Sequence, residues 1–189
     1  MVKGEIYYLI GKPNHLKHEL LNSLTHLSES YASCTVFQTF TTSDVIAKDG
    51  HFEYLDEVDF KLRQSMDMFS LYWEKNGMFY GISGEVSEYL NKGINVVING
   101  SLHNVEQASK LFPQMNVIMV KKQKPSSELA MEGYPLIIDE DVQLEWVNNV
   151  NGIYCPYVLT LLEDNAQEKA AELLIKLIEY NESYLDKVI

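Results

Sequence analysis

Short apolar runs alternate with amphipathic stretches along this chain of 189 residues. The first run covers residues 5–10, ends at Gly11 and predicts a buried strand. Leucines at helical spacing follow, from Leu16 to Leu27, and predict a helix over about residues 15–28 with one apolar face. The chain therefore opens with a strand, a glycine turn and a helix.

The same alternation predicts the elements that follow. Further strands are expected over residues 34–42, 68–73, 78–80, 94–98, 117–120 and 157–162, and further helices over residues 55–64, 84–92, 105–111 and 166–185. Asn76-Gly77 favours a tight hairpin turn between two of these strands, and Gly93 ends a helix. Alternating strands and helices predict a largely parallel, three-layer α/β fold. Residues 125–156 give no clear pattern.

Composition places the chain among ordinary globular domains. Hydrophobic residues make up 46% and charged residues 22%, and the length suits one domain with a sizeable core. Cys34 and Cys155 are too few for a disulfide scaffold, so a reduced, cytoplasmic setting is expected. No stretch approaches the roughly 18 to 20 apolar residues that span a bilayer, and the N-terminus lacks the features of an export signal. We therefore expect a protein that is neither exported nor membrane-spanning.

The formal net charge of −12 narrows the kinds of partner. Nucleic acids and anionic membranes attract surfaces rich in lysine and arginine, so neither is an expected partner. Any phosphate site must be a local basic pocket. Arg63 is the only arginine in the chain, although enzymes that transfer phosphoryl groups commonly grip phosphate with guanidinium forks. Two roles are open to Arg63, a phosphate contact or a surface ion pair.

The turn between the first strand and the first helix carries part of a phosphate-binding motif. Its sequence is Gly11-Lys12-Pro13-Asn14-His15-Leu16-Lys17-His18. Gly11 and Lys17 are in register with G-x-x-x-x-G-K-[ST], in which backbone N–H groups cradle phosphates and the lysine reaches the outer ones. Leu16 replaces the second glycine, and its side chain is expected to obstruct the approach of a phosphate. His18 replaces the hydroxyl that binds Mg²⁺.

Two interpretations of this loop are open. In the first, loop residues hold ATP, and these residues are Gly11, Lys12, Asn14, His15, Lys17 and His18. In the second, the segment is an ordinary turn with a solvated Lys17. The spacing of His15 and His18 allows joint metal ligation, but no matching cluster of ligands accompanies them in the sequence. No metal site is therefore predicted, and Mg²⁺ is expected to be held mainly through the phosphates of ATP.

A second pattern lies between residues 60 and 119. It consists of Phe60, Arg63, Leu71 and Trp73, then Asn-Gly-Met-Phe-Tyr-Gly at 76–81, Gly93, Val-Val-Ile-Asn-Gly-Ser at 96–101, and Gln107-Ala108. This pattern resembles the ribose 1,5-bisphosphate phosphokinases, relatives of guanylate kinase that are associated with phosphonate breakdown. Together with the opening strand, Gly11 and Lys17, the resemblance covers about residues 4–120.

The resemblance implies a three-layer P-loop NTPase fold with a mostly parallel sheet and a guanylate kinase-like small subdomain. Residues 1–189 would form a single domain, with a substrate-binding subdomain at about 35–85 and a divergent lid at about 121–156. It also implies an ATP-dependent phosphotransferase that acts on a ribose phosphate and forms 5-phosphoribosyl diphosphate. Lys17 and Asp44 would be catalytic. The substrate-binding positions would be Ser43, Tyr72, Tyr80, Gly81, Ser83, Asn99 and Gly100.

The chain departs from that family at its arginines. The family has T-R-D and N-G-S-R where this chain has Thr-Ser-Asp at 42–44 and Asn-Gly-Ser-Leu at 99–102, and the lid arginines are replaced by Lys121, Lys122 and Lys124. Losing groups that neutralise the transferred phosphoryl group can cost orders of magnitude in rate. Either lysines substitute for them, or the chain is a catalytically degenerate relative that binds a nucleotide, a phosphorylated metabolite or a protein partner.

A guanylate-type nucleoside monophosphate kinase is a further alternative. Guanylate kinases carry an acidic residue where this chain has Tyr72, which disfavours a guanine pocket. In each enzymatic alternative the expected partner is a small phosphorylated substrate. The sequence indicates no oligomeric state.

Overall fold

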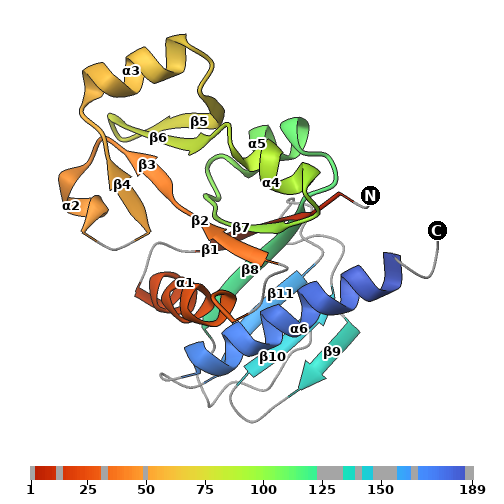
Figure 1. Cartoon of the computed structure of the whole chain (residues 1–189). Helices are drawn as coiled ribbons and strands as arrows, with labels where there is room; N and C mark the ends of the chain where they lie inside the picture. The colour runs from red at the N-terminus through yellow and green to blue at the C-terminus, as the bar shows by residue number, and fades with distance from the viewer. Residues whose placement is uncertain are drawn as a thin grey trace.

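The chain forms two β-sheets that share one hydrophobic interior (Figure 1). The structure is a computed structural model and describes residues 3–11, 15–30, 34–48, 51–122, 134–138, 142–146, 157–162 and 166–185. The larger sheet has seven strands and the smaller has four. Within the part of the chain that the structure describes, no helix is long and apolar enough to cross a membrane.

The larger sheet carries the parallel core that the sequence predicts. Its strands, in spatial order, are β2 (Cys34–Phe37), β7 (Asn95–Asn99), β1 (Ile6–Gly11), β8 (Asn116–Lys122), β11 (Tyr157–Leu161), β10 (Val142–Trp146) and β9 (Tyr134–Ile138). The first five are parallel to one another, whereas β10 and β9 are antiparallel additions. Every residue of β1 is buried, as expected for a strand that is central in such a sheet.

Helices cover both faces of the larger sheet. The helices are α1 (His15–Ser28) and α6 (Gln167–Leu185), which lie side by side on one face, and α4 (Val86–Asn91) and α5 (Val105–Leu111), which pack on the other (Figure 1). Strand β1 serves both faces because successive side chains alternate. Leu9 packs with the leucines of α1, whereas Ile10 packs with Val86 and Val105. The predicted three-layer α/β fold is therefore confirmed.

Residues 39–83 form the smaller sheet and its two helices. They comprise β3 (Thr39–Thr41), α2 (Asp44–Ala47), β4 (Phe52–Tyr54), α3 (Glu57–Ser65), β5 (Phe69–Lys75) and β6 (Met78–Ser83), and the strand order is β4-β3-β6-β5. Strands β5 and β6 form the predicted hairpin. Its turn needs two residues with positive φ, and Asn76 and Gly77 have φ of 54° and 72°. We call residues 39–83 the subdomain.

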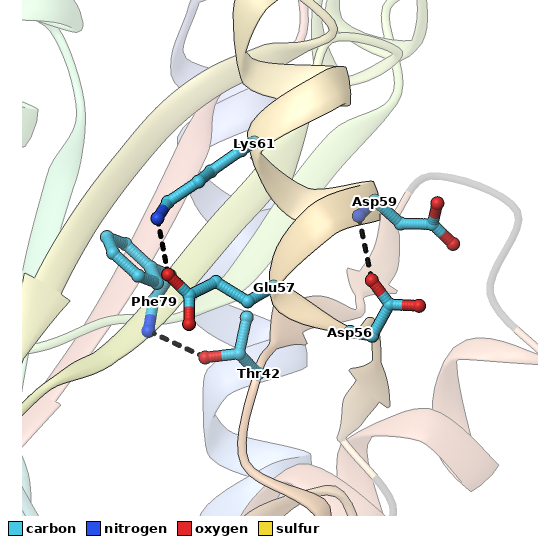
Figure 2. A network of polar contacts seen from close by, with 6 residues as sticks. All are labelled: Thr42, Asp56, Glu57, Asp59, Lys61 and Phe79. Atoms are coloured by element: carbon cyan, nitrogen blue, oxygen red, sulfur yellow. Dashed lines mark hydrogen bonds and ion pairs between the residues drawn. The ribbon is translucent and has the colours of Figure 1, made fainter.

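Polar contacts order the start of α3 and join the hairpin to Thr42, whose Oγ1 accepts a hydrogen bond of 3.0 Å from the N–H of Phe79 (Figure 2). Asp56 caps the helix by accepting a hydrogen bond of 2.8 Å from the backbone N–H of Asp59. One turn on, Lys61 pairs with Glu57 and places its ammonium 5.4 Å from the ring centre of Phe79. The subdomain is thus a folded unit with its own contacts, and its hairpin is held in a defined orientation.

Four elements were not predicted from the sequence: α2, β4, β9 and β10. The last two lie inside the region expected to form a lid, and there they extend the larger sheet. Residues 123–133, 139–141 and 147–156, which make up most of that region, lie outside the described residues.

Candidate functional site

The predicted phosphate loop joins the central strand to the first helix. Gly11 ends β1, and a Cβ at this position would lie 2.6 Å from the carbonyl oxygen of Val120 on β8, so only glycine fits. Helix α1 begins at His15. Lys12, Asn14 and the side chain of His15 lie outside the described residues, so their predicted roles in ATP binding stay predictions.

Lys17 is buried rather than solvated. Its side chain is 8% exposed, and its Nζ donates a hydrogen bond of 2.6 Å to the carbonyl oxygen of Gly100. Burial, and secondarily the positive charge of Lys75, lower the pKa of Lys17 from 10.5 to about 8. The interpretation of this segment as a turn with a solvated lysine is therefore wrong.

The acceptor of that hydrogen bond belongs to the segment that leaves β7. Asn99 ends the strand and is 4% exposed, and its Nδ2 has no hydrogen-bond partner. A Cβ on Gly100 would lie 2.4 Å from the ring of Tyr8, so glycine lets the chain pass over that ring. The Tyr8 hydroxyl then accepts a hydrogen bond of 3.2 Å from the N–H of Ser101. The structure thus brings together Lys17, Asn99 and Gly100 at the carboxyl edge of two parallel strands, where open α/β sheets bind ligands.

Leu16 lies on the apolar face of α1, as its helical spacing predicted. It is 8% exposed and belongs to the core cluster that contains Leu20 and Leu24. Its side chain therefore packs beneath α1, because helical spacing places residues 16, 20 and 24 on one face. The expected obstruction of a phosphate by Leu16 stays a prediction, because residues 12–14 lie outside the described residues.

His18 contacts the subdomain. Its ring centre lies 6.4 Å from that of His51 and 5.9 Å from that of Phe52. Phe52 contacts Tyr80 at 6.2 Å, and Tyr80 stacks on Trp73 at 5.3 Å. We call these five rings the aromatic row. It connects the first turn of α1 with the far strand of the subdomain, so the position of the usual Mg²⁺-binding hydroxyl is occupied by a ring that packs between elements.

Tyr80 and Gly81 belong to the packing of the subdomain. Tyr80 is 7% exposed, and burial raises the pKa of its hydroxyl while the side chain of Thr41 hydrogen-bonds to it. A Cβ on Gly81 would lie 2.8 Å from the ring of Phe69. Both residues were predicted to bind substrate, and the packing gives each a structural reason to be present.

Ser43 and Asp44 begin the short helix α2. The Ser43 hydroxyl accepts a hydrogen bond of 3.3 Å from the N–H of Ile46 and so caps the helix. Asp44 follows in the first turn with an exposed carboxylate. Of the predicted acceptor-binding residues on the subdomain, Asp44 is thus the charged one that solvent reaches.

The two remaining predicted substrate residues line different cavities. Tyr72 lies in a cleft of about 600 Å³ between the hairpin and α5, which also includes His103 and Lys110. Ser83 lines a groove of about 590 Å³ beside α1 and β2. The structure does not bring Tyr72 and Ser83 together.

Within the described residues, Arg63 does not form the surface ion pair considered from the sequence, and its role as a phosphate contact stays a prediction. Its guanidinium lies 5.1 Å from the ring centre of Phe40 in a cation–π contact. The ion pairs among the described residues join Lys61 to Glu57 and Lys110 to Glu106. Arg63 therefore packs within the subdomain and makes no ion pair there.

Lys75 is the functional candidate that sequence reasoning missed. It ends β5, is half-buried, and its charge acts on Lys17. The signal was available in the alternation of the hairpin, since Lys75 follows the buried Trp73 by two residues and so lies on the same face. No group of three or more histidine, cysteine, aspartate or glutamate side chains in the described ranges could hold a metal ion.

Lys17 lies in the first turn of the helix that follows the central strand of the parallel sheet, the order of strand, helix and lysine that P-loop nucleotide-binding proteins share. No protein-family model matches the sequence. The chain is nevertheless similar to curated ribose 1,5-bisphosphate phosphokinases. It is 28% identical over 120 residues to the protein of Thiobacillus denitrificans, covering 64% of this chain and 63% of that protein. It is 30% identical over 117 residues to the protein of Achromobacter xylosoxidans, covering 62% and 60%.

The matched region is thus less than two thirds of the length of these relatives. For the protein of Laribacter hongkongensis it is 28% of the length, at 28% identity over 117 residues and 62% of this chain. A guanylate kinase from Anaplasma phagocytophilum has a TM-score of 0.49 and 16% identity, covering 67% of this chain and 63% of that one. The resemblance to ribose 1,5-bisphosphate phosphokinases that the sequence pattern indicated is confirmed by the curated relatives.

Proposed function

We propose that this protein is an ATP-dependent phosphotransferase that acts on a ribose phosphate, as its phosphokinase relatives are named to do, and forms 5-phosphoribosyl diphosphate. The observation that carries the proposal is the buried ammonium of Lys17 beside the carbonyl of Gly100. Burying a cation costs free energy unless it is paired, and the acceptor that Lys17 has among the described residues is a neutral carbonyl. Such perturbed groups are common at functional sites. A phosphate oxygen would replace that carbonyl with a stronger, charge-assisted hydrogen bond.

The groups at the site fit ATP better than they fit a dedicated magnesium site. Lys17 and the unpartnered amide of Asn99 are donors, which suits phosphate oxygens. His18 offers no hydroxyl, and its ring packs in the aromatic row. Mg²⁺ would therefore enter with the phosphates and remain bound mainly to them and to water.

The sugar phosphate is proposed to bind on the subdomain side. Asp44 is exposed there and could orient the acceptor hydroxyl, while the Tyr80 hydroxyl would contact it after the aromatic row opens. No covalent intermediate is needed, because phosphoryl transfer rests on positioning and charge stabilisation. Ser83 and Tyr72 line other cavities and have no part in this proposal.

A specific observation favours a second candidate, a silent relative that binds a phosphorylated ligand without turnover. The aromatic row joins α1 to the subdomain, and Tyr80 is 7% exposed at its centre. A substrate that needs the Tyr80 hydroxyl must first separate these rings. If that separation does not occur, the donors around Lys17 would still bind phosphate.

A thermal-shift screen with Mg·ATP, GMP and ribose phosphates separates these candidates, since a ligand that binds the folded state raises its stability. We expect Mg·ATP to raise the midpoint and Lys17→Met to remove that rise. A coupled assay for ADP release on ribose 1,5-bisphosphate then tests turnover. Binding without turnover would favour the silent relative, and no shift with any nucleotide would contradict both.

A further inference from the structure

Lys75 lies on the face of the hairpin that is turned toward the larger sheet. Trp73, two residues earlier, is 8% exposed and packs in one core cluster with Ile10 and Ile98. Ile10 is the second-last residue of β1, and Ile98 is the second-last residue of β7. Since alternate residues of a strand share a face, Lys75 extends this face beyond the core, toward the carboxyl ends of β1 and β7.

Among the described residues, Lys75 forms no ion pair with a carboxylate. Lys61 and Lys110, by contrast, each pair with a glutamate one turn away. Lys75 is in neither pair, yet it is close enough to Lys17 to contribute to the lowering of the Lys17 pKa. Two neighbouring cations without a neutralising carboxylate repel each other, and a bound anion removes that repulsion.

A third donor lies beside this pair of lysines. Asn99 directly precedes Gly100, whose carbonyl holds the Lys17 ammonium, and its buried Nδ2 has no partner. A buried amide without a hydrogen bond is unfavourable and is rare in folded proteins. Among the described residues, the Asn99 amide therefore lies next to the carbonyl that holds Lys17, and Lys75 acts on the same ammonium from β5.

We propose that Lys75 binds the polyphosphate of the nucleotide together with Lys17 and Asn99, and supplies from the subdomain the positive charge that arginines supply in the similar phosphokinases. This inference rests on the proposed function for the place of the polyphosphate. The proposal adds a residue that lies outside the pattern shared with the phosphokinases. That pattern includes Trp73 and Asn76 and leaves the two positions between them, one of which is Lys75, unspecified. A cation on the subdomain would also draw the subdomain toward the nucleotide when it binds.

Titration calorimetry with inorganic tripolyphosphate and with ATP tests the proposal on the full chain. Lys75→Met should weaken both about tenfold and reduce the salt dependence of binding, and Lys75→Gln should do the same. Lys75→Arg should stay within about twofold of wild type, because it keeps the charge. Lys92→Met is the matched control: Lys92 follows α4, lies over Tyr89, and its loss should leave the affinity unchanged.

A second readout needs no ligand. Lysine NMR should show the Lys17 pKa near 8 in wild type, raised in Lys75→Met and unchanged in Lys75→Arg. If wild type binds ATP and Lys75→Met binds it equally well, or if the Lys17 pKa does not move, the inference is overturned and the proposed function stands. If wild type binds neither tripolyphosphate nor ATP, the proposed function and this inference both fail.

Discussion

The ammonium of Lys17 and the carbonyl of Gly100 are joined by a hydrogen bond of 2.6 Å across 83 positions of the sequence. This contact ties the first turn of α1 to the end of β7. It leaves a charged group in the interior with a neutral partner, an arrangement that is weaker than an ion pair and easier to exchange for a phosphate.

Replacing Lys17 by methionine should stabilise the protein. The folded pKa of about 8 lies below the ordinary 10.5, so charging Lys17 in the fold costs at most about 3 kcal/mol at neutral pH, of which the Gly100 hydrogen bond offsets a part. We expect the free energy of unfolding to rise by about 1 to 3 kcal/mol in Lys17→Met. Urea unfolding at about pH 7 measures this, with Lys92→Met as the control.

The cost of burying the charged Lys17 also predicts how the free energy of unfolding changes with pH. Between about pH 8 and 10.5 the unfolded chain binds more protons at Lys17 than the folded chain does, so stability should rise with pH across this window. Below about pH 8 the free-energy cost of burying the charged Lys17 is fully present. In Lys17→Met the free energy of unfolding should no longer rise with pH across this window. A destabilised variant, or an unchanged slope, would show that Lys17 is charged in the fold without penalty.

The affinity for ATP should fall as pH rises through about 8. Binding requires the protonated Lys17, whose pKa in the free protein is about 8, whereas the terminal phosphate is already fully ionised there. Titration calorimetry from pH 7 upward should show a loss approaching about tenfold per unit.

Lys17→Arg is the control for this pH profile. A guanidinium remains charged throughout, so any residual affinity in that variant should not change with pH. A flat profile in the wild-type protein would contradict a direct role for the Lys17 charge.

His18→Ser should weaken the packing around position 18 and add a group that can coordinate Mg²⁺. The variant loses the ring contacts with His51 and Phe52, which together are worth about 1 to 2 kcal/mol, and gains the hydroxyl that P-loop proteins offer to Mg²⁺. We expect lower stability but a larger effect of Mg²⁺ on ATP affinity. Phe52→Leu is the control because it loosens the same contact without adding a hydroxyl. Equal Mg²⁺ effects in the two variants would refute the role of position 18.

The sequence predicted the parallel sheet, the hairpin turn and the loop between β1 and α1 because each depends on local pattern. Asn76 and Gly77 are the clearest case, since both have the positive φ that such a turn requires. The short elements α2 and β4 escaped because four and three residues carry no detectable periodicity. They form through contacts with β3, which only the fold supplies.

The site was harder to predict than the fold. Lys17 was found from its motif, but its burial depends on Gly100, which is distant in sequence. Leu16 lies with Leu20 on the buried face of α1, as the helical spacing of the leucines predicted. Tyr72 and Ser83 were grouped by analogy, although they line different cavities. A sequence pattern can thus identify single site residues, whereas which of them lie close together is seen only in the folded structure.

Replacing Gly81 by alanine tests whether the stability of the subdomain depends on close packing at this position. A methyl group at this position would lie 2.8 Å from the Phe69 ring, which is itself stacked on Phe60 at 4.6 Å. Neither ring can retreat freely, because Phe60 is fully buried. Gly81→Ala should therefore lower the free energy of unfolding by about 1 to 3 kcal/mol.

Two further variants isolate the cause of that loss. Phe69→Leu in the Gly81→Ala background should recover part of the stability, because a smaller side chain removes the clash, and the two changes should be non-additive. Gly77→Ala is the matched glycine control: nothing lies within 4 Å of its Cβ, so it bears only the cost of a positive φ of 72°, about 1 kcal/mol. Equal losses in Gly81→Ala and Gly77→Ala, with no recovery in the double variant, would mean that backbone conformation rather than the Phe69 contact requires glycine at position 81.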